Sequence, residues 1–151
     1  GLSPKENRDI PPLDYDIVHD MKAQFPALHL SLNGGVATLE EALKHLDAGL
    51  DGVMIGRAAY HQPWDILHEV DARVFGVENP LTEPQEAARA MLPYIDKHVA
   101  SGGKLGQISK HMLGLFTGRP GARAWRRVLS EGAHKPGAGT ALVEAALAEL
   151  D

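Results

Sequence analysis

Two short apolar runs in the first half of the chain each stop at glycine, with a helix pattern between them. Leu28–Leu32 is followed by Asn33-Gly34-Gly35, and Val53–Ile55 is followed by Gly56-Arg57. The intervening residues, 38–46, repeat apolar side chains at helical spacing behind a threonine that can cap the helix. Strand, glycine turn, helix, strand and glycine turn is the order of a parallel βαβ unit, so the sequence predicts an α/β fold here.

The two glycine turns also predict a site for a phosphate group. Glycine lets a backbone N–H approach a bound group with no Cβ in the way, and a phosphate needs several such donors and, where possible, a cation. The amides of Gly34, Gly35 and Gly56 can supply the donors, and Arg57 the cation. The alternative is that Gly34-Gly35 is only a tight turn. Two such turns about 22 residues apart favour the phosphate site, which in (β/α)8 barrels usually follows strands seven and eight.

The segment before the first strand is expected to be a polar loop and then a helix. Residues 1–13 are typical of the loop, and Tyr15–Gln24 of the helix, with an aspartate that can cap it. The loop holds a polar cluster of Lys5, Asn7 and Arg8, and a loop after a strand end faces the active site of a barrel. A solvated loop without a function is the alternative.

The hydrophobic pattern changes after residue 78. A short helix starts at Pro63, residues 79–84 have the composition of a linker, and four helix patterns with short connections and no strand follow. That order predicts a small helical bundle. A boundary near 78/79 therefore divides the chain into an α/β part, residues 1–78, and an all-α part, residues 79–151.

The α/β part is too small to be a complete domain. A two-stranded parallel sheet cannot cover its own faces, and a complete (β/α)8 TIM barrel needs about 250 residues, whereas the chain has 151. We therefore expect residues 1–78 to be the C-terminal strands and helices of an incomplete barrel, in the C-terminal portion of a longer protein.

Charge is distributed unevenly along the chain. Residues 1–80 carry a net charge of −7, residues 81–130 carry +5, and residues 131–151 carry −3. Seven Lys and Arg and no acidic residue lie between Lys97 and Ser130. A basic block in an acidic chain indicates a surface that faces a polyanion, with an ordinary solvated helix face as the alternative.

Arginines dominate the end of this basic block. Arg119, Arg123, Arg126 and Arg127 fall along one side of a predicted helix and its leading turn, which suits the phosphates of a nucleic acid. Trp125 on the same helix can stack on a base, but its spacing with apolar neighbours favours a place in the core.

Composition limits the remaining possibilities. The chain has no cysteine, which excludes disulfides and thiolate metal sites and is compatible with the cytoplasm. No apolar run approaches membrane-spanning length, so no membrane partner is expected. The eight histidines show no metal-ligand spacing beside a carboxylate, and the sequence has no Ser/His/Asp set and no Walker-type loop, so no metal site is expected.

Five motifs resemble those of tRNA-dihydrouridine synthases, and of the A-type bacterial subfamily in particular. They are Gly1-Leu-Ser-Pro-Lys-Glu-Asn-Arg8, Ser31-Leu-Asn-Gly-Gly35, Asp51-Gly-Val-Met-Ile-Gly-Arg-Ala-Ala-Tyr60, His111-Met-Leu-Gly-Leu-Phe116 and Arg119-Pro-Gly-Ala-Arg-Ala-Trp-Arg-Arg127. The resemblance covers essentially the whole chain. It implies an FMN-binding (β/α)8 barrel followed by a helical tRNA-binding domain, in agreement with the boundary near residue 79.

The resemblance also implies an activity and its site residues. The family reduces the C5–C6 double bond of uridine in the tRNA D-loop, at positions 20 and 20a in the A-type enzymes. NADPH is the reductant, FMN carries the hydride, and a cysteine is the general acid. The motif match implies that the FMN phosphate is held by Asn33, Gly34, Gly35, Gly56 and Arg57. It implies tRNA contacts by Arg8, Arg123 and Arg126.

The chain departs from the family in what it lacks. It has no counterpart of the catalytic cysteine, of the lysine and histidine at the flavin ring, or of the strands that carry them, so this chain alone is expected to be inactive and to contain no catalytic residue. Two other hypotheses remain. One is a non-catalytic RNA-binding helical module in residues 79–151, and the other is a different FMN- or phosphate-binding barrel oxidoreductase that acts on small molecules.

Overall fold

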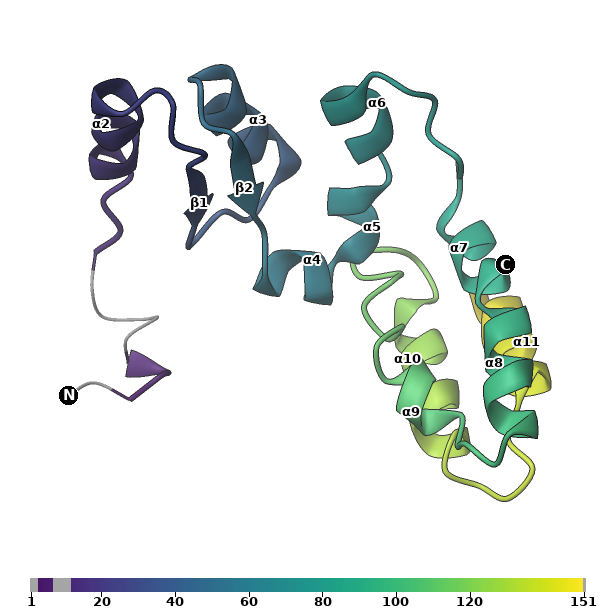
Figure 1. Ribbon diagram of the computed structural model, residues 1–151. Coiled ribbons are helices and arrows are strands. Elements are labelled where there is room, and N and C mark those ends of the chain that lie inside the picture. The colour runs from purple at the N-terminus through teal and green to yellow at the C-terminus, as the bar shows by residue number, and fades with distance from the viewer. Residues whose placement is uncertain (1–2, 7–11, 151) are drawn as a thin grey trace. The chain divides into compact units, whose positions relative to one another are not determined.

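The computed structural model describes residues 3–6 and 12–150, and Figure 1 shows the order of their elements. The chain divides into two compact units, residues 1–56 and residues 57–151. This division falls earlier than the predicted domain boundary near 78/79, because the short helices that follow residue 56 pack with the later helices. The boundary near 78/79 stays a prediction about the domains of the family.

The first unit contains a parallel βαβ arrangement, as the sequence predicts. Its elements are α2 (Asp16–Gln24), β1 (Ser31–Asn33), α3 (Leu39–Asp47) and β2 (Gly52–Met54). The two strands pair in parallel, with Ser31 opposite Gly52 and Asn33 opposite Met54. Strand β1 begins three residues later than the predicted strand, because residues 25–28 form a turn closed by a hydrogen bond from the Leu28 amide to the Phe25 carbonyl (3.0 Å).

Helix α3 begins where the threonine signal places it. The Thr38 hydroxyl accepts a hydrogen bond from the Glu41 amide at 3.1 Å, which satisfies one of the free N–H groups of the first turn. The Glu41 carboxylate accepts from the amide of Ala37 at 3.0 Å, one residue before the N-cap. The two bonds together form a capping box whose second bond is shifted by one residue.

The core of the first unit is small. Four hydrophobic residues are buried in it: Leu32, Val36, Ala42 and Leu50. Helix α2 buries no residue, and the side chain of Met54 in β2 is 52% exposed. The apolar run of residues 53–55 therefore forms a strand that is not fully buried, because only one face of the two-stranded sheet is covered.

The second unit contains helices, turns and loops but no strand in its described residues. Its elements are α4 (Arg57–His61), α5 (Pro63–Leu67), α6 (Val70–Phe75), α7 (Pro84–Ala90), α8 (Leu92–Ala100), α9 (Gly106–Ser109), α10 (Ala122–Gly132), α11 (Thr140–Leu147) and the 3-10 turn η1 (Ala148–Leu150). Helix α4 stands where the sequence predicts only a turn. The predicted helix from Pro63 to about Val70 is shorter in the structure, where α5 ends at Leu67 and the separate helix α6 begins at Val70.

Helices α7–α11 share one hydrophobic core. Among its fully buried side chains are Ile95 in α8, Trp125 in α10 and Val143 in α11. Helix α10 packs against α11 (Figure 1). This core holds α10 by its apolar face and leaves the opposite face of the helix for other contacts.

Candidate functional site

The two glycine turns leave the sheet at the same edge. Asn33 and Met54 are the last residues of β1 and β2 and lie opposite each other in the parallel register. Gly34 and Gly35 follow at once with φ of +133° and +70°, and Gly56 lies two residues beyond Met54. The predicted donors therefore gather at the carboxyl ends of neighbouring parallel strands, where open α/β sheets bind their ligands.

The amides at this edge are open to a ligand. Asn33, Gly35 and Gly56 are exposed. Among the described residues, no backbone hydrogen bond outside the helices and strands uses the amide of Gly34, Gly35 or Gly56. Arg57 follows directly, is exposed, and opens α4. Backbone amides are donors of the kind that a phosphate requires, so Gly34, Gly35 and Gly56 fit the FMN phosphate that the resemblance implies.

Gly35 and Gly56 differ in the space around them. A Cβ on Gly35 would collide with a methyl group of Leu13 and would lie 2.7 Å from the hydroxyl of Tyr15. A Cβ on Gly56 would meet nothing closer than Met54, at 3.6 Å. Internal packing therefore requires glycine at position 35, whereas the backbone at position 56 is open to the approach of a ligand.

Tyr15 supports the first glycine turn. Its hydroxyl donates a hydrogen bond of 2.8 Å to the carbonyl of Gly34. Its ring lies edge-on to that of His45 at 4.9 Å, and His45 Nδ1 lies 3.0 Å from Nε2 of His19. The sequence does not predict this support, because residues on three different elements give no local signal of their contact.

Helix α10 presents an arginine face, which we define as Arg119, Arg123, Arg126 and Arg127. All four side chains are exposed. Arg119 lies 4.0 Å from Asp65, and Arg127 lies 4.0 Å from Glu149. Arg123 and Arg126 have no carboxylate within 4 Å among the described residues and stand three positions apart on the helix. These two guanidinium groups can meet the phosphates of a nucleic acid.

Trp125 belongs to the core, and the alternative that it stacks on a base is wrong. Its side chain is 0% exposed. The ring lies edge-on to Phe116 at 4.8 Å, and Nε1 donates a hydrogen bond of 3.2 Å to the carbonyl of Met112. An indole in this position fixes α10 and cannot reach a nucleobase.

The structure describes only part of the opening loop. Arg8 and Asn7 lie outside the described residues, so the tRNA contact of Arg8 stays a prediction. Lys5 is exposed. The amide of Ser3 donates to the Glu6 carboxylate at 2.8 Å, and this short turn lowers the pKa of Glu6.

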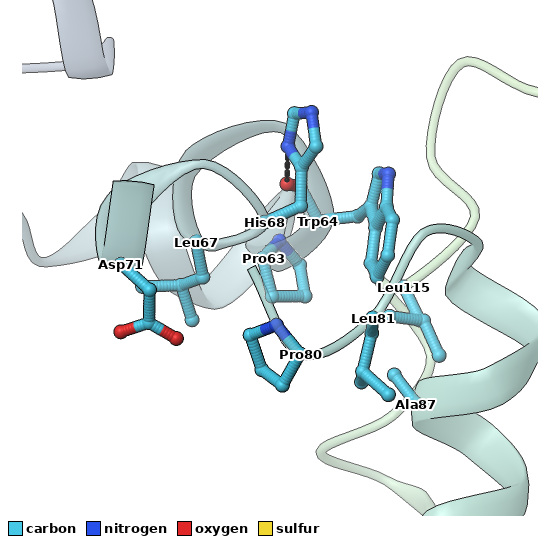
Figure 2. Close-up of a pocket in the computed structure, with 9 residues that line it drawn as sticks. All are labelled: Pro63, Trp64, Leu67, His68, Asp71, Pro80, Leu81, Ala87 and Leu115. Atoms are coloured by element: carbon cyan, nitrogen blue, oxygen red, sulfur yellow. Dashed lines mark hydrogen bonds between the residues drawn. The ribbon is translucent and has the colours of Figure 1, made fainter. Parts of the chain in front are cut away.

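Figure 2 shows a cavity of about 220 Å³ in the second unit, which the sequence does not predict. Trp64 and Leu115 line it together with Pro80 of the linker, so residues far apart in the sequence form it. His68 stacks on Trp64 at 5.2 Å, and its Nδ1 lies 2.6 Å from the Trp64 carbonyl. The lining is mainly apolar, with Asp71 as the carboxylate. The cavity lacks the convergent polar groups of a catalytic site.

Membrane-spanning and metal-binding features are both absent from the part of the chain that the structure describes. None of its helices has the length and hydrophobicity that a membrane crossing requires. No three His, Asp or Glu side chains of the same part come together as possible metal ligands.

Comparison with known proteins gives a consistent answer. The sequence model of a family described as dihydrouridine synthase (Dus) matches residues 1–151. Three relatives carry the name tRNA-dihydrouridine(20/20a) synthase. The protein from Vibrio cholerae is 54% identical over 150 residues, which are 99% of this chain and 45% of the relative. The proteins from Salmonella typhi and Escherichia coli K12 are 56% and 54% identical over 147 residues, which are 97% of this chain and 44% and 42% of the relatives. The chain thus spans less than half the length of these curated relatives.

Proposed function

The chain belongs to the dihydrouridine synthase family, and from that premise we propose that it supplies the C-terminal part of an enzyme that reduces uridine to 5,6-dihydrouridine in the tRNA D-loop. The observation that supports tRNA as the substrate is the pair Arg123 and Arg126. Both side chains are exposed, and neither has an acidic partner among the described residues. The names of the relatives point to uridines 20 and 20a as the targets. A tRNA substrate also favours a cytoplasmic location.

The proposal includes FMN as cofactor and NADPH as reductant. The phosphate of FMN would be held by Asn33, Gly34, Gly35, Gly56 and Arg57. When bound, FMN would supply the hydride that reduces the C5–C6 double bond. The amides of these residues would anchor the phosphate end by hydrogen bonds, and Arg57 would neutralise its charge. Because the chain has no cysteine, we place the proton donor for C5 outside these 151 residues.

We assign residues 1–78 to the C-terminal strands of a (β/α)8 barrel and residues 79–151 to a helical tRNA-binding domain. The parallel register of β1 and β2 supports the first assignment. The exposed side chain of Met54 in β2 also supports this assignment, since further parts of a barrel would cover the face of the sheet on which it lies.

An RNA-binding module without catalysis is the second candidate. This candidate is favoured by the hydrophobic core that helices α7–α11 share, because that core can hold the arginine face in place without the barrel. The two candidates differ in whether a flavin is needed.

The deciding experiment uses the protein with a complete barrel upstream of this chain. We expect a yellow protein with the absorbance of bound FMN that forms dihydrouridine in unmodified tRNA when NADPH is added. Absorbance spectroscopy and detection of dihydrouridine in digested tRNA are the measurements. A protein that binds tRNA but neither retains FMN nor forms dihydrouridine would leave only the RNA-binding module.

The first prediction concerns the salt dependence of tRNA binding. The variant with Arg123→Ala and Arg126→Ala loses two phosphate contacts, so the slope of log K against log salt should become flatter by roughly 1–2. Binding titrations at several salt concentrations measure it. The matched control is Arg89→Ala, an exposed arginine on α7 that lies 3.9 Å from Glu144. Equal slopes in the double variant and the control would count against the tRNA role of the arginine face.

A further inference from the structure

The loop that joins α9 to α10 lies against α4. We propose that this joint loop, residues 110–121, fixes the position of α4 relative to α10, the helix that carries Arg123 and Arg126. We further propose that Gly114 and Thr117 in the loop, and Tyr60 in α4, are positioning residues for the reaction. The inference rests on the proposed function, in which the Arg57 end of α4 binds the phosphate of FMN and the arginine face binds tRNA.

Gly114 allows the closest approach between the joint loop and α4. A Cβ on Gly114 would lie 2.5 Å from the carbonyl oxygen of His61 and 3.1 Å from that of Tyr60. His61 is the last residue of α4. Backbone therefore packs directly on backbone here, and a side chain at position 114 would have to push the end of α4 away.

Two hydrogen bonds hold the same end of α4. The Thr117 hydroxyl donates to the carbonyl of His61 at 3.0 Å, which satisfies one of the carbonyl groups left free at a helix end. The hydroxyl of Tyr60 lies 2.9 Å from Nδ1 of His111, at the start of the loop. The joint loop thus contacts α4 at three of its own positions, 111, 114 and 117.

The other side of the joint loop is anchored to α10. Met112 and Phe116 are buried in the core of the second unit. The Met112 carbonyl accepts the hydrogen bond from Trp125 Nε1, and the Phe116 ring packs edge-on against Trp125. Trp125 stands between Arg123 and Arg126 in the sequence of α10. A continuous series of contacts therefore runs from α4, through the loop, to the helix of the arginine face.

This arrangement has a specific consequence for the reaction. Reduction of a uridine requires the cofactor and the tRNA to be aligned, and a misplacement of about 1 Å can lower a rate by about 10²-fold. The joint loop sets the position of α4 relative to α10, whereas Arg123, Arg126 and the residues that would hold the FMN phosphate lie outside the loop. Variants that disrupt the contacts between the joint loop and α4 should therefore lower kcat for uridine reduction more than they weaken the binding of FMN or tRNA.

The test compares two disturbed joints in the FMN-loaded full-length enzyme. One is Gly114→Ala, and the other combines Tyr60→Phe with Thr117→Val, which removes both hydroxyl groups without adding bulk. In both variants we expect kcat for uridine reduction to fall by about tenfold or more, with the Kd values for tRNA and FMN within about twofold of wild type. Hydrogen exchange should become faster at the amide of Gln62, which donates to the Ala58 carbonyl of α4 at 2.8 Å, and stay unchanged in α10.

Two matched controls separate the joint from general effects of substitution. A Cβ on Gly139 would have no atom within 4 Å, and the residue has extended backbone, so Gly139→Ala adds the same methyl group in open space. Tyr94 is an exposed tyrosine whose ring lies 6.5 Å from that of His98, so Tyr94→Phe removes a comparable hydroxyl. Both controls should keep kcat and exchange near wild type.

The outcomes distinguish this inference from the proposed function. Wild-type kcat and exchange in both disturbed joints would overturn the inference and leave the proposed function intact. A fall in kcat that only follows loss of FMN or of folded protein would also overturn it, since the contacts would then be merely structural. If Gly114→Ala does not fold, the double hydroxyl variant decides between these outcomes. A wild-type enzyme that forms no dihydrouridine would refute the proposed function and the inference together.

Discussion

At the scale of single residues, Lys22 and Asp51 form an ion pair that holds the segments leading into β1 and β2. The ammonium group of Lys22 lies 2.7 Å from the Asp51 carboxylate and donates to the carbonyls of Pro26 and Leu28 at 3.0 Å and 2.8 Å. The same carboxylate accepts from the Leu30 amide at 2.8 Å. One ion pair thus fixes the end of α2, the turn before β1 and the residue before β2.

These bonds give a prediction about acid stability. The hydrogen bonds from Lys22 and from the Leu30 amide lower the pKa of Asp51 below its ordinary value. The unfolded chain therefore takes up the proton first, at about pH 3.9, and the stabilisation present at neutral pH is lost as the pH falls through the folded pKa. In the protein with a complete barrel, Asp51→Asn should lower the thermal midpoint at pH 7, and the gap to wild type should narrow as the pH falls below about 3.9.

The control for this prediction is Asp20→Asn, since Asp20 is an exposed carboxylate on α2 without a partner among the described residues. Thermal melts followed by circular dichroism at several pH values give the comparison. A gap between wild type and Asp51→Asn that stays constant from pH 7 to about pH 2 would contradict the assigned role of the carboxylate.

At the scale of elements, α10 shows how one helix serves both folding and binding. Trp125 and Leu129 lie on its buried face, and Arg123 and Arg126 on its exposed face. Because the indole is fully buried and hydrogen-bonded to Met112, Trp125→Ala should lower the free energy of unfolding by about 3–5 kcal/mol. Urea unfolding followed by circular dichroism measures the change.

The same variant separates packing from RNA contact. At temperatures where Trp125→Ala remains folded, the salt slope of tRNA binding should match that of wild type, because no phosphate contact is lost. A destabilisation below about 1 kcal/mol would place the indole outside the core and contradict the structure.

The elements also show which parts of the fold the sequence predicts. Helices α3 and α10 are predictable because each is long enough for its apolar spacing to be recognised. Helices α4 and α6 are not recognisable as separate elements, since five or six residues make fewer than two helical turns, too few for an apolar spacing to repeat. The start of β1 is misplaced from sequence because Asp51, remote in sequence, pairs with Lys22 and accepts from the Leu30 amide, which holds the preceding turn.

The candidate site follows the same rule. The glycines and arginines are predictable from their motifs, because a backbone turn or a cluster of charge depends on residues that are close together in the sequence. The support of Gly34 by Tyr15 and the contact of Gly114 with His61 are not predictable in this way. Both join residues far apart in the chain, and local spacing carries no information on such contacts.

At the scale of the whole molecule, the two units differ in the cores that stabilise them. The core of residues 57–151 includes 13 buried hydrophobic residues of the described part, whereas that of residues 1–56 includes four. Burial of apolar surface is the main favourable term in folding. The second unit therefore has the means to fold alone, and the first unit does not.

Separate peptides test this difference. We expect residues 57–151 to show helical circular dichroism and one cooperative thermal transition. Residues 1–56 should show neither a cooperative transition nor protected amides, because a two-stranded parallel sheet is not stable by itself. A cooperative transition in the first peptide alone, or none in the second, would refute this division of stability.

The contrast between the two glycines at the sheet edge has a consequence for the evolution of the family. At position 35, the backbone has a φ of +70° and a Cβ would lie 2.7 Å from the hydroxyl of Tyr15, so the fold disfavours any side chain whether or not a cofactor is bound. A descendant that lost its flavin would retain glycine there for as long as it kept the fold. At position 56, where the space is open, only the ligand can maintain glycine by selection. Drift at position 56 with constancy at position 35 would therefore mark the lineages in which the cofactor has been abandoned.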